Sequence, residues 1–123
     1  MPSQAWKYLE RKVAKDIKGE RILQKGMSVA DVKKGNILID TKNRKRASIT
    51  NGIKKIMQYR SYNEQIMILI HRVSGKKTIS VYMMKSDLEK LIKESLQKND
   101  FIVQLRYEDF VRMAKKIKGV KNA

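Results

Sequence analysis

The segment Ser28–Arg46 reads SVADVKKGNILIDTKNRKR and contains two short apolar runs that meet at a glycine. We predict strands over 27–33 and 36–42, joined in an antiparallel hairpin, because Gly35 can adopt the positive φ that a tight turn requires. Two acids, Asp31 and Asp40, lie inside this hairpin of an otherwise strongly basic chain. The position of these acids is the feature of the sequence that most needs an explanation.

The register of the hairpin decides whether these acids meet. A turn at Lys34–Gly35 would place Asp31 opposite Leu38. Since strand side chains return to the same face at every second residue, Asp40 would then be the diagonal neighbour of Asp31, and Lys42 would follow on that face. Diagonal Cβ atoms lie about 7–8 Å apart. The spacing therefore predicts two carboxylates and one ammonium group side by side, provided that the loop has this length.

The rest of the chain predicts one α/β domain that covers residues 1–123. Residues 65–73 are almost continuously apolar, which is typical of a strand buried on both faces. A helix between strands 36–42 and 65–73 makes a crossover unit, so these two strands should be parallel. Ser86 and Glu89 form a capping-box pattern. Helices are predicted over 4–17, 48–60, 86–98 and 108–118, and further strands over 21–24, 78–84 and, as an edge strand, 101–107.

The composition points to a polyanionic partner. The chain has 29 Lys and Arg against 12 Asp and Glu, a formal charge of +17, which favours nucleic acid over mere solubility. Cysteine is absent, which excludes disulfides and thiolate metal sites. Neither a signal peptide nor an apolar run of about 20 residues is visible, so we expect no membrane partner and an intracellular, cytoplasmic protein, compatible with a viral or plasmid origin.

Two carboxylates beside a lysine suit a hard divalent cation. Mg²⁺ prefers carboxylate oxygens and waters, and substrate phosphate oxygens commonly complete its octahedron. Such an ion polarises a phosphodiester and lowers the pKa of a bound water, while a nearby lysine stabilises charge on the transition state. The alternative is that Asp31 and Asp40 are exposed acids paired with neighbouring lysines, which contributes little energy.

Residues 30–42, ADVKKGNILIDTK, resemble the bipartite motif of the PD-(D/E)xK nuclease superfamily, also called the restriction-endonuclease-like fold. The motif has an Asp near the start of one hairpin strand and an acid-x-Lys in the next. The predicted element order over 3–73 resembles the αβββαβ core of that superfamily. The resemblance implies a mixed central sheet flanked by helices, here with an extra strand and C-terminal helices. Ala30 stands where family members commonly have Pro, and Asp40 where they more often have Glu.

The resemblance also implies roles for individual residues of the hairpin. Asp31 and Asp40 would be metal ligands, together with the backbone carbonyl of Thr41. Lys42 would be the catalytic lysine. The metal would be Mg²⁺, with Mn²⁺ as an alternative ion.

The first helix of such nucleases often supplies a further acid to the site. Glu10 is the best-placed candidate for a catalytic and metal-binding role, and Asp16 and Glu20 are the alternatives. Glu10 could equally form a surface ion pair with Lys7, one helical turn earlier, worth only tenths of a kcal/mol.

Contacts to nucleic acid are expected on both sides of the motif. Ser28 could bind a phosphate, as in resolvases of this superfamily. Arg44, Lys45 and Arg46 follow the catalytic lysine and could hold the phosphates that flank the cut. The alternative for each of these three residues is a solvated loop.

The functional hypothesis is an Mg²⁺-dependent endodeoxyribonuclease, most concretely a Holliday junction or other branched-DNA resolvase. The small basic chain and the glutamate on the N-terminal helix are similar to archaeal and viral resolvases. Cutting two strands of a junction implies a homodimer, with its interface at 101–107 or on the helix 86–98. The alternatives are a non-catalytic basic nucleic-acid-binding protein of the same fold and a restriction or repair nuclease. The sequence does not specify the preferred DNA structure.

Overall fold

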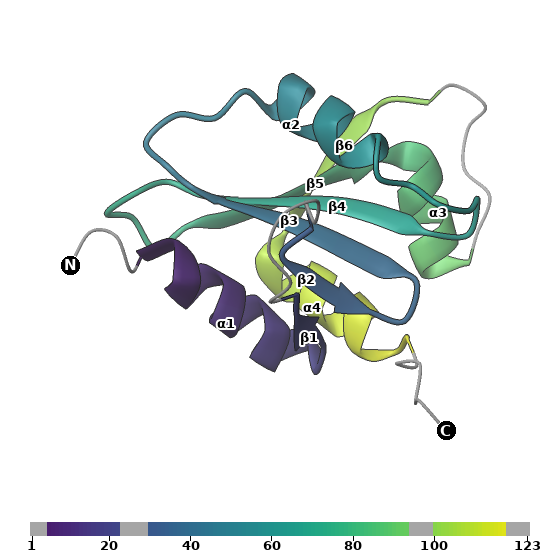
Figure 1. Ribbon diagram of the computed structural model, residues 1–123, viewed down its shortest axis with the longest axis horizontal. Coiled ribbons are helices and arrows are strands. Elements are labelled where there is room, and N and C mark those ends of the chain that lie inside the picture. Colours follow the sequence, from purple (N-terminus) through teal and green to yellow (C-terminus); the bar gives the residue numbers. More distant parts are fainter. Residues whose placement is uncertain (1–4, 23–29, 94–99, 118–123) are drawn as a thin grey trace.

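The computed structural model describes residues 5–22, 30–93 and 100–117, which form a six-stranded mixed sheet with helices packed against it (Figure 1). The α/β class predicted from the sequence is confirmed. In this view α1 and α4 lie on one face of the sheet and α2 lies on the other. The elements in chain order are α1 (Ala5–Ile17), β1 (Glu20–Arg21), β2 (Val32–Lys34), β3 (Ile37–Asn43), α2 (Ile49–Met57), β4 (Ile66–Arg72), β5 (Ile79–Met84), α3 (Lys85–Ile92), β6 (Ile102–Arg106) and α4 (Tyr107–Lys115).

The strands lie in the sheet in the order in which they occur in the chain. Neighbouring strands are antiparallel except β3 and β4, which are parallel and connected through α2, as the crossover pattern predicts. Every residue of β4 from Ile66 to Ile70 is fully buried, which confirms that this strand is covered on both faces. Gly52 allows α2 to approach closely, because a Cβ at this position would lie 2.7 Å from the Leu69 side chain.

The principal core lies between α1, α4 and the sheet. Leu9, Val13 and Ile17 follow one face of α1 at helical spacing and are fully buried. They pack against alternate residues of β3, Ile37 and Ile39, which belong to the same apolar cluster. Since side chains alternate along a strand, the intervening positions of β3 point away from this core.

The turn of the β2–β3 hairpin differs from the sequence prediction. Lys34 is paired with Ile37, so the two-residue loop is Gly35–Asn36 and not Lys34–Gly35. The prediction that Asp31 opposes Leu38 is therefore wrong, because Lys33 occupies that place. Moving a two-residue loop along by one position shifts each cross-strand partner by two, which leaves every side chain on its original face.

The predicted capping box on α3 is also wrong. This helix begins at Lys85, and its N-cap residue Met84 provides no side-chain hydrogen bond. Ser86 instead lies in the first turn, where its amide and hydroxyl donate to the Asp100 carboxylate at 3.0 and 2.8 Å. The first turn of α3 is therefore capped by Asp100, which lies just before β6. The edge strand expected at 101–107 is confirmed as β6.

A buried ion pair connects the chain after α2 to α3. The Asp87 carboxylate is completely buried and accepts two hydrogen bonds from Arg60 Nη2, at 2.8 and 3.0 Å. Arg60 Nη1 donates to the carbonyl of Gln65, directly before β4, at 2.7 Å. Lys90 lies 3.3 Å from the same carboxylate. This network fixes the entry of the chain into the central strand.

Replacement of Asp87 by Asn should destabilise the protein by about 3 kcal/mol, because Arg60 would keep its charge in a partly buried place without a counter-charge. The matched control is Asp109→Asn, which breaks the exposed pair between Arg106 and Asp109 (3.1 Å) and should have a much smaller effect, because exposed ion pairs contribute little to stability. Urea denaturation of both variants measures the difference. Equal losses in the two variants would show that the buried pair has no special importance.

Candidate functional site

Asp31 is clamped between two neighbouring segments directly before β2. Its amide donates to the carbonyl of Ile39 at 2.7 Å, and its carbonyl accepts from the amide of Ile22 at 2.8 Å. Its carboxylate Oδ2 accepts hydrogen bonds from the amide and the hydroxyl of Thr41, at 2.8 and 3.1 Å. The carboxylate of Asp31 is therefore held against the middle of β3, next to Asp40.

Asp40 and Lys42 complete this cluster from β3. Asp40 is only 5% exposed, and its neighbour in β4 is the buried Leu69. Lys42 Nζ lies 3.3 Å from Asp40 Oδ2. Burial raises the pKa of Asp40 to about 7, and the adjacent Asp31 carboxylate adds to this rise while Lys42 opposes it. The structure thus brings two carboxylates and one ammonium group together, and Asp40 is not an exposed surface acid.

Glu10, on α1, lies within electrostatic range of Asp31. It is 5% exposed, and its Oε1 accepts a hydrogen bond from Arg21 Nη2 of β1 at 3.1 Å. Burial and the negative charge of Asp31 raise the pKa of Glu10, while Arg21 lowers it. Of the other candidate acids, Asp16 accepts a hydrogen bond from the first residue of α4, and Glu20 is exposed. Glu10 is therefore the candidate that lies within electrostatic reach of Asp31.

The ligands for a cation at this site are limited to few protein groups. Within 5–22, 30–93 and 100–117, no three His, Asp or Glu side chains lie close enough together to hold a metal ion. The immediate donors are the two carboxylates of Asp31 and Asp40, since Glu10 is paired with Arg21. Two adjacent carboxylates resist joint ionisation unless a positive charge joins them. A hard cation that keeps several waters or phosphate oxygens, such as Mg²⁺, suits this donor set.

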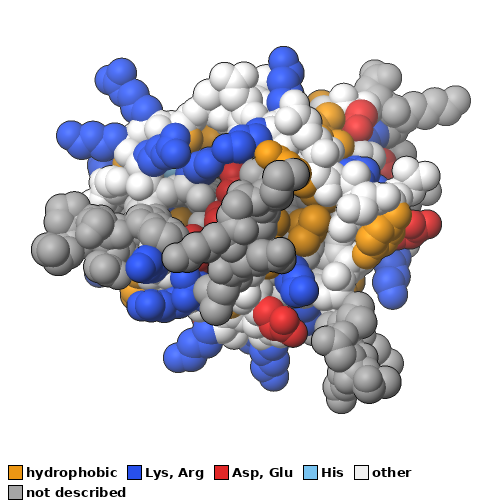
Figure 2. All heavy atoms as spheres, in the orientation of Figure 1, with side chains coloured by type: hydrophobic (Ala, Val, Ile, Leu, Met, Phe, Trp, Pro, Cys, Tyr) orange, Lys and Arg blue, Asp and Glu red, His pale blue; other side chains and the backbone are white. Residues whose placement is uncertain are grey.

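The basic loop after β3, formed by Arg44, Lys45 and Arg46, is exposed. Its start is fixed, because the Arg44 amide donates to the carbonyl of Arg72 at the end of β4, at 3.2 Å. Figure 2 shows Lys and Arg side chains spread over the visible face, with a small group of acidic side chains near its centre. Ser28, predicted to bind phosphate, lies outside the described residues.

Sequence reasoning missed two features of this site. Arg21 was not predicted as the partner of Glu10. The short strand β1 follows α1 directly, so its residues lie next to that helix. Thr41 was predicted to contribute its carbonyl, but the structure also gives it a hydrogen-bonding role toward Asp31 through its amide and hydroxyl. The spacing of Asp40 and Lys42 places Thr41 between them, but the sequence does not indicate that Thr41 contacts Asp31.

Comparisons with known proteins add no identification to this geometry. No family model, no curated protein and no solved structure matches the chain. Among the described residues, no helix combines the length and the apolar character needed to cross a bilayer. The function is therefore argued from the arrangement of the site itself.

Asp40→Asn should change the pH dependence of stability in the metal-free protein. The pKa of Asp40 rises from an ordinary 3.8 to about 7 on folding. The folded state then binds more protons than the unfolded state between these values, so stability falls as pH rises toward 7 and levels off above it. An asparagine side chain cannot ionise, so the variant should gain on the order of 2–4 kcal/mol over wild type between pH 4 and pH 8.

Urea denaturation in EDTA at several pH values between 4 and 8 measures this difference, with Asp109→Asn as a control that should follow the wild type. A stability difference between wild type and Asp40→Asn that stays constant across this range would contradict the raised pKa.

Proposed function

We propose that this chain is a metal-dependent endonuclease that hydrolyses phosphodiester bonds of DNA. The observation that supports this most is the convergence of Asp31, Asp40 and Lys42 where β2 meets β3, with Glu10 beside them. The order α1–β1–β2–β3–α2–β4, with β3 and β4 parallel, is compatible with the αβββαβ core of the PD-(D/E)xK superfamily that the motif resembles.

Asp31 and Asp40 would hold a Mg²⁺ ion, with the Thr41 carbonyl and Glu10 as further ligands and Mn²⁺ as an alternative ion. When bound, the ion would polarise the phosphodiester and lower the pKa of a water molecule. The raised pKa of Asp40 supports this assignment, because a cation between the two carboxylates would relieve the repulsion that disfavours its ionised form. For Glu10 to join, its carboxylate would have to leave Arg21.

The residues of the chain itself would position and neutralise the reacting groups. Thr41 restrains the Asp31 carboxylate through two hydrogen bonds. Lys42 lies next to Asp40 and would stabilise the additional negative charge that develops on the phosphate oxygens. A water molecule would attack phosphorus in line and release one proton to solvent, the bond from phosphorus to the 3′ oxygen would break, and that oxygen would leave with a proton taken from solvent. The products would carry a 5′-phosphate and a 3′-hydroxyl.

The basic loop would hold the phosphates next to the cut. Arg44, Lys45 and Arg46 follow Lys42 closely along the chain and are exposed. Contacts of this kind position the backbone without reading sequence and weaken as salt rises. This supports a substrate chosen by its structure rather than by its base sequence.

We place the substrate among branched DNAs, with a Holliday junction as the most concrete case. A junction needs two cuts, so the active form would be a homodimer. The exposed side of the edge strand β6 and the helix α3 are the candidate interfaces. A restriction or repair nuclease would use the same chemistry on another DNA structure. A non-catalytic DNA-binding protein of the same fold is favoured by one observation, namely that Glu10 is occupied by Arg21.

Cleavage of a labelled four-way junction in Mg²⁺ or Mn²⁺ tests the proposal. Asp31→Asn, Asp40→Asn and Lys42→Ala should each lower the rate at least about 100-fold, since each removes charge at the reacting phosphate. Asp109→Asn, the matched carboxamide control away from the site, should cut like wild type. In EDTA, Asp40→Asn should bind the junction at least as tightly as wild type, because a negative charge near the phosphates is removed.

Two outcomes would change the proposal. Wild-type protein that binds junction, flap, nicked and duplex DNA but leaves all of them uncut would identify the non-catalytic alternative. Full activity of Asp40→Asn would remove Asp40 from the metal ligands.

Thr41→Val tests the restraint on Asp31. The valine has nearly the same shape but loses the hydroxyl donor, so the Mg²⁺ concentration for half-maximal cleavage should rise about tenfold. Thr41→Ser keeps the hydroxyl and should restore the wild-type value. An unchanged metal requirement in Thr41→Val would show that the amide of residue 41 is sufficient to hold Asp31.

A further inference from the structure

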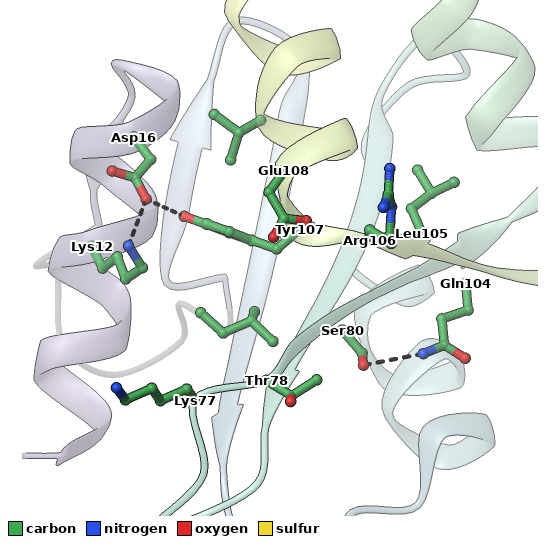
Figure 3. A pocket seen from close by; sticks show the side chains of 12 residues that line it. Lys12, Asp16, Lys77, Thr78, Ser80, Gln104, Leu105, Arg106, Tyr107 and Glu108 are labelled. Atoms are coloured by element: carbon green, nitrogen blue, oxygen red, sulfur yellow. Dashed lines mark hydrogen bonds and ion pairs between the residues drawn. The ribbon is translucent and has the colours of Figure 1, made fainter.

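A groove lies along α1 on the flank opposite Glu10. It has a volume of about 890 Å³ and runs between α1, the strands β5 and β6, and the start of α4 (Figure 3). Glu10 lies two residues from Lys12, a rotation of about 200° around a helix, so the groove and the candidate catalytic cluster occupy opposite flanks of α1. The groove is lined by Lys12, Lys77, Ser80, Gln104, Arg106 and Tyr107, among others.

Tyr8 and Arg72 do not line the groove but lie next to it, toward the N-terminal end of α1. Tyr8 lies one helical turn before Lys12, and Arg72 is the strand partner of the lining residue Ile79. The Tyr8 side chain is 56% exposed, and the Arg72 guanidinium lies 5.7 Å from its ring centroid. An aromatic ring with a cation on one face and more than half of its surface exposed can stack a second planar group.

The wall of the groove on the α1 side is a fixed polar surface. The Tyr107 hydroxyl donates to Asp16 at 2.7 Å, and Lys12 pairs with the same carboxylate at 3.2 Å. Lys12 also lies 5.6 Å from the centroid of the Tyr107 ring. Lys77, in the segment before β5, is exposed and extends its side chain toward α1 (Figure 3).

Backbone contacts connect this groove to the basic loop. The Arg44 carbonyl accepts from the Ser74 amide at 3.2 Å, and His71 Nε2 lies 3.0 Å from the same carbonyl. Asn43 is the strand partner of Arg72. The loop that follows Lys42 and the rim of the groove therefore form one unit at the ends of β3 and β4, which a single nucleic-acid strand could follow from one flank of α1 to the other.

We infer that this groove and the adjacent Tyr8 together bind an unpaired nucleotide of single-stranded DNA, with its base stacked on Tyr8 and its phosphate in the groove between Lys12 and Lys77. Stacking of bases on exposed aromatic rings beside cations is how proteins bind single strands without sequence preference. This inference rests on the proposed function, because it takes DNA as the polyanion that the protein binds. It narrows the branched substrates of the proposed function to those that carry a single-stranded branch, in place of a fully paired four-way junction.

Binding in EDTA tests this inference without any cleavage. The probes are a blunt duplex and the same duplex with a six-nucleotide single-stranded tail that carries 2-aminopurine. Wild-type protein should prefer the tailed duplex and quench the 2-aminopurine fluorescence. Tyr8→Ala should lose about tenfold in affinity for the tailed duplex only, whereas Tyr8→Phe should behave like wild type. Lys77→Gln should weaken binding of the tailed duplex. The slope of log K against log salt concentration should become shallower by about 1, because one phosphate contact is lost.

The matched control is Tyr62→Ala, which removes another exposed aromatic residue, 49% exposed, in the turn before β4. This variant should keep the preference for the tail. Equal losses in Tyr8→Ala and Tyr62→Ala, or no quenching by wild type, would overturn the inference. An uncleaved junction would refute only the nuclease proposal, since tail binding is measured without metal. Wild-type cleavage without a preference for tailed DNA would refute only the groove assignment.

Discussion

The close approach of two carboxylates, Asp31 and Asp40, is the interaction on which this site depends. Two such groups repel each other, and burial of Asp40 makes its ionisation still less favourable. The fold maintains the arrangement because Thr41 binds Asp31 through both its amide and its hydroxyl, and because Lys42 lies against Asp40. A cation is the natural complement of this cluster, which would explain why a chain with a charge of +17 has acids in its hairpin.

The strand β3 carries this cluster and is supported on both edges. Seven of its residues pair with β4, and α2 packs closely over that neighbour through Gly52. The hairpin is anchored further by Lys34, whose buried ammonium group donates to the carbonyl of Ala114 at 2.9 Å, near the C-terminal end of α4. A cation at this end of a helix also opposes the negative end of the helix dipole. The basic loop and the groove lie outside the paired centre of the sheet, where a polyanion can reach them.

The helix α1 lies between the two proposed surfaces, the carboxylate cluster and the groove. Glu10 faces the carboxylate cluster on one flank, while Tyr8 and Lys12 face the groove on the other. A double-stranded arm at the catalytic cluster and a single strand in the groove would therefore bind one branched molecule around the end of this helix. Both proposals draw on the same excess of positive charge, but they depend on different side chains.

Local periodicity and chain connectivity were sufficient to predict the α/β class, the parallel pairing of β3 with β4 and the edge position of β6. Alternation along β3 likewise places Asp40 and Lys42 on one face for either turn, but Asp31 precedes β2 and reaches them through its backbone bond to Ile39 and its side-chain bonds to Thr41. The position of Asp31, the Gly35–Asn36 loop and the pairing of Glu10 with Arg21 could not be read from the sequence. These features arise from contacts between segments distant in the chain, whose energies no local pattern of residues contains.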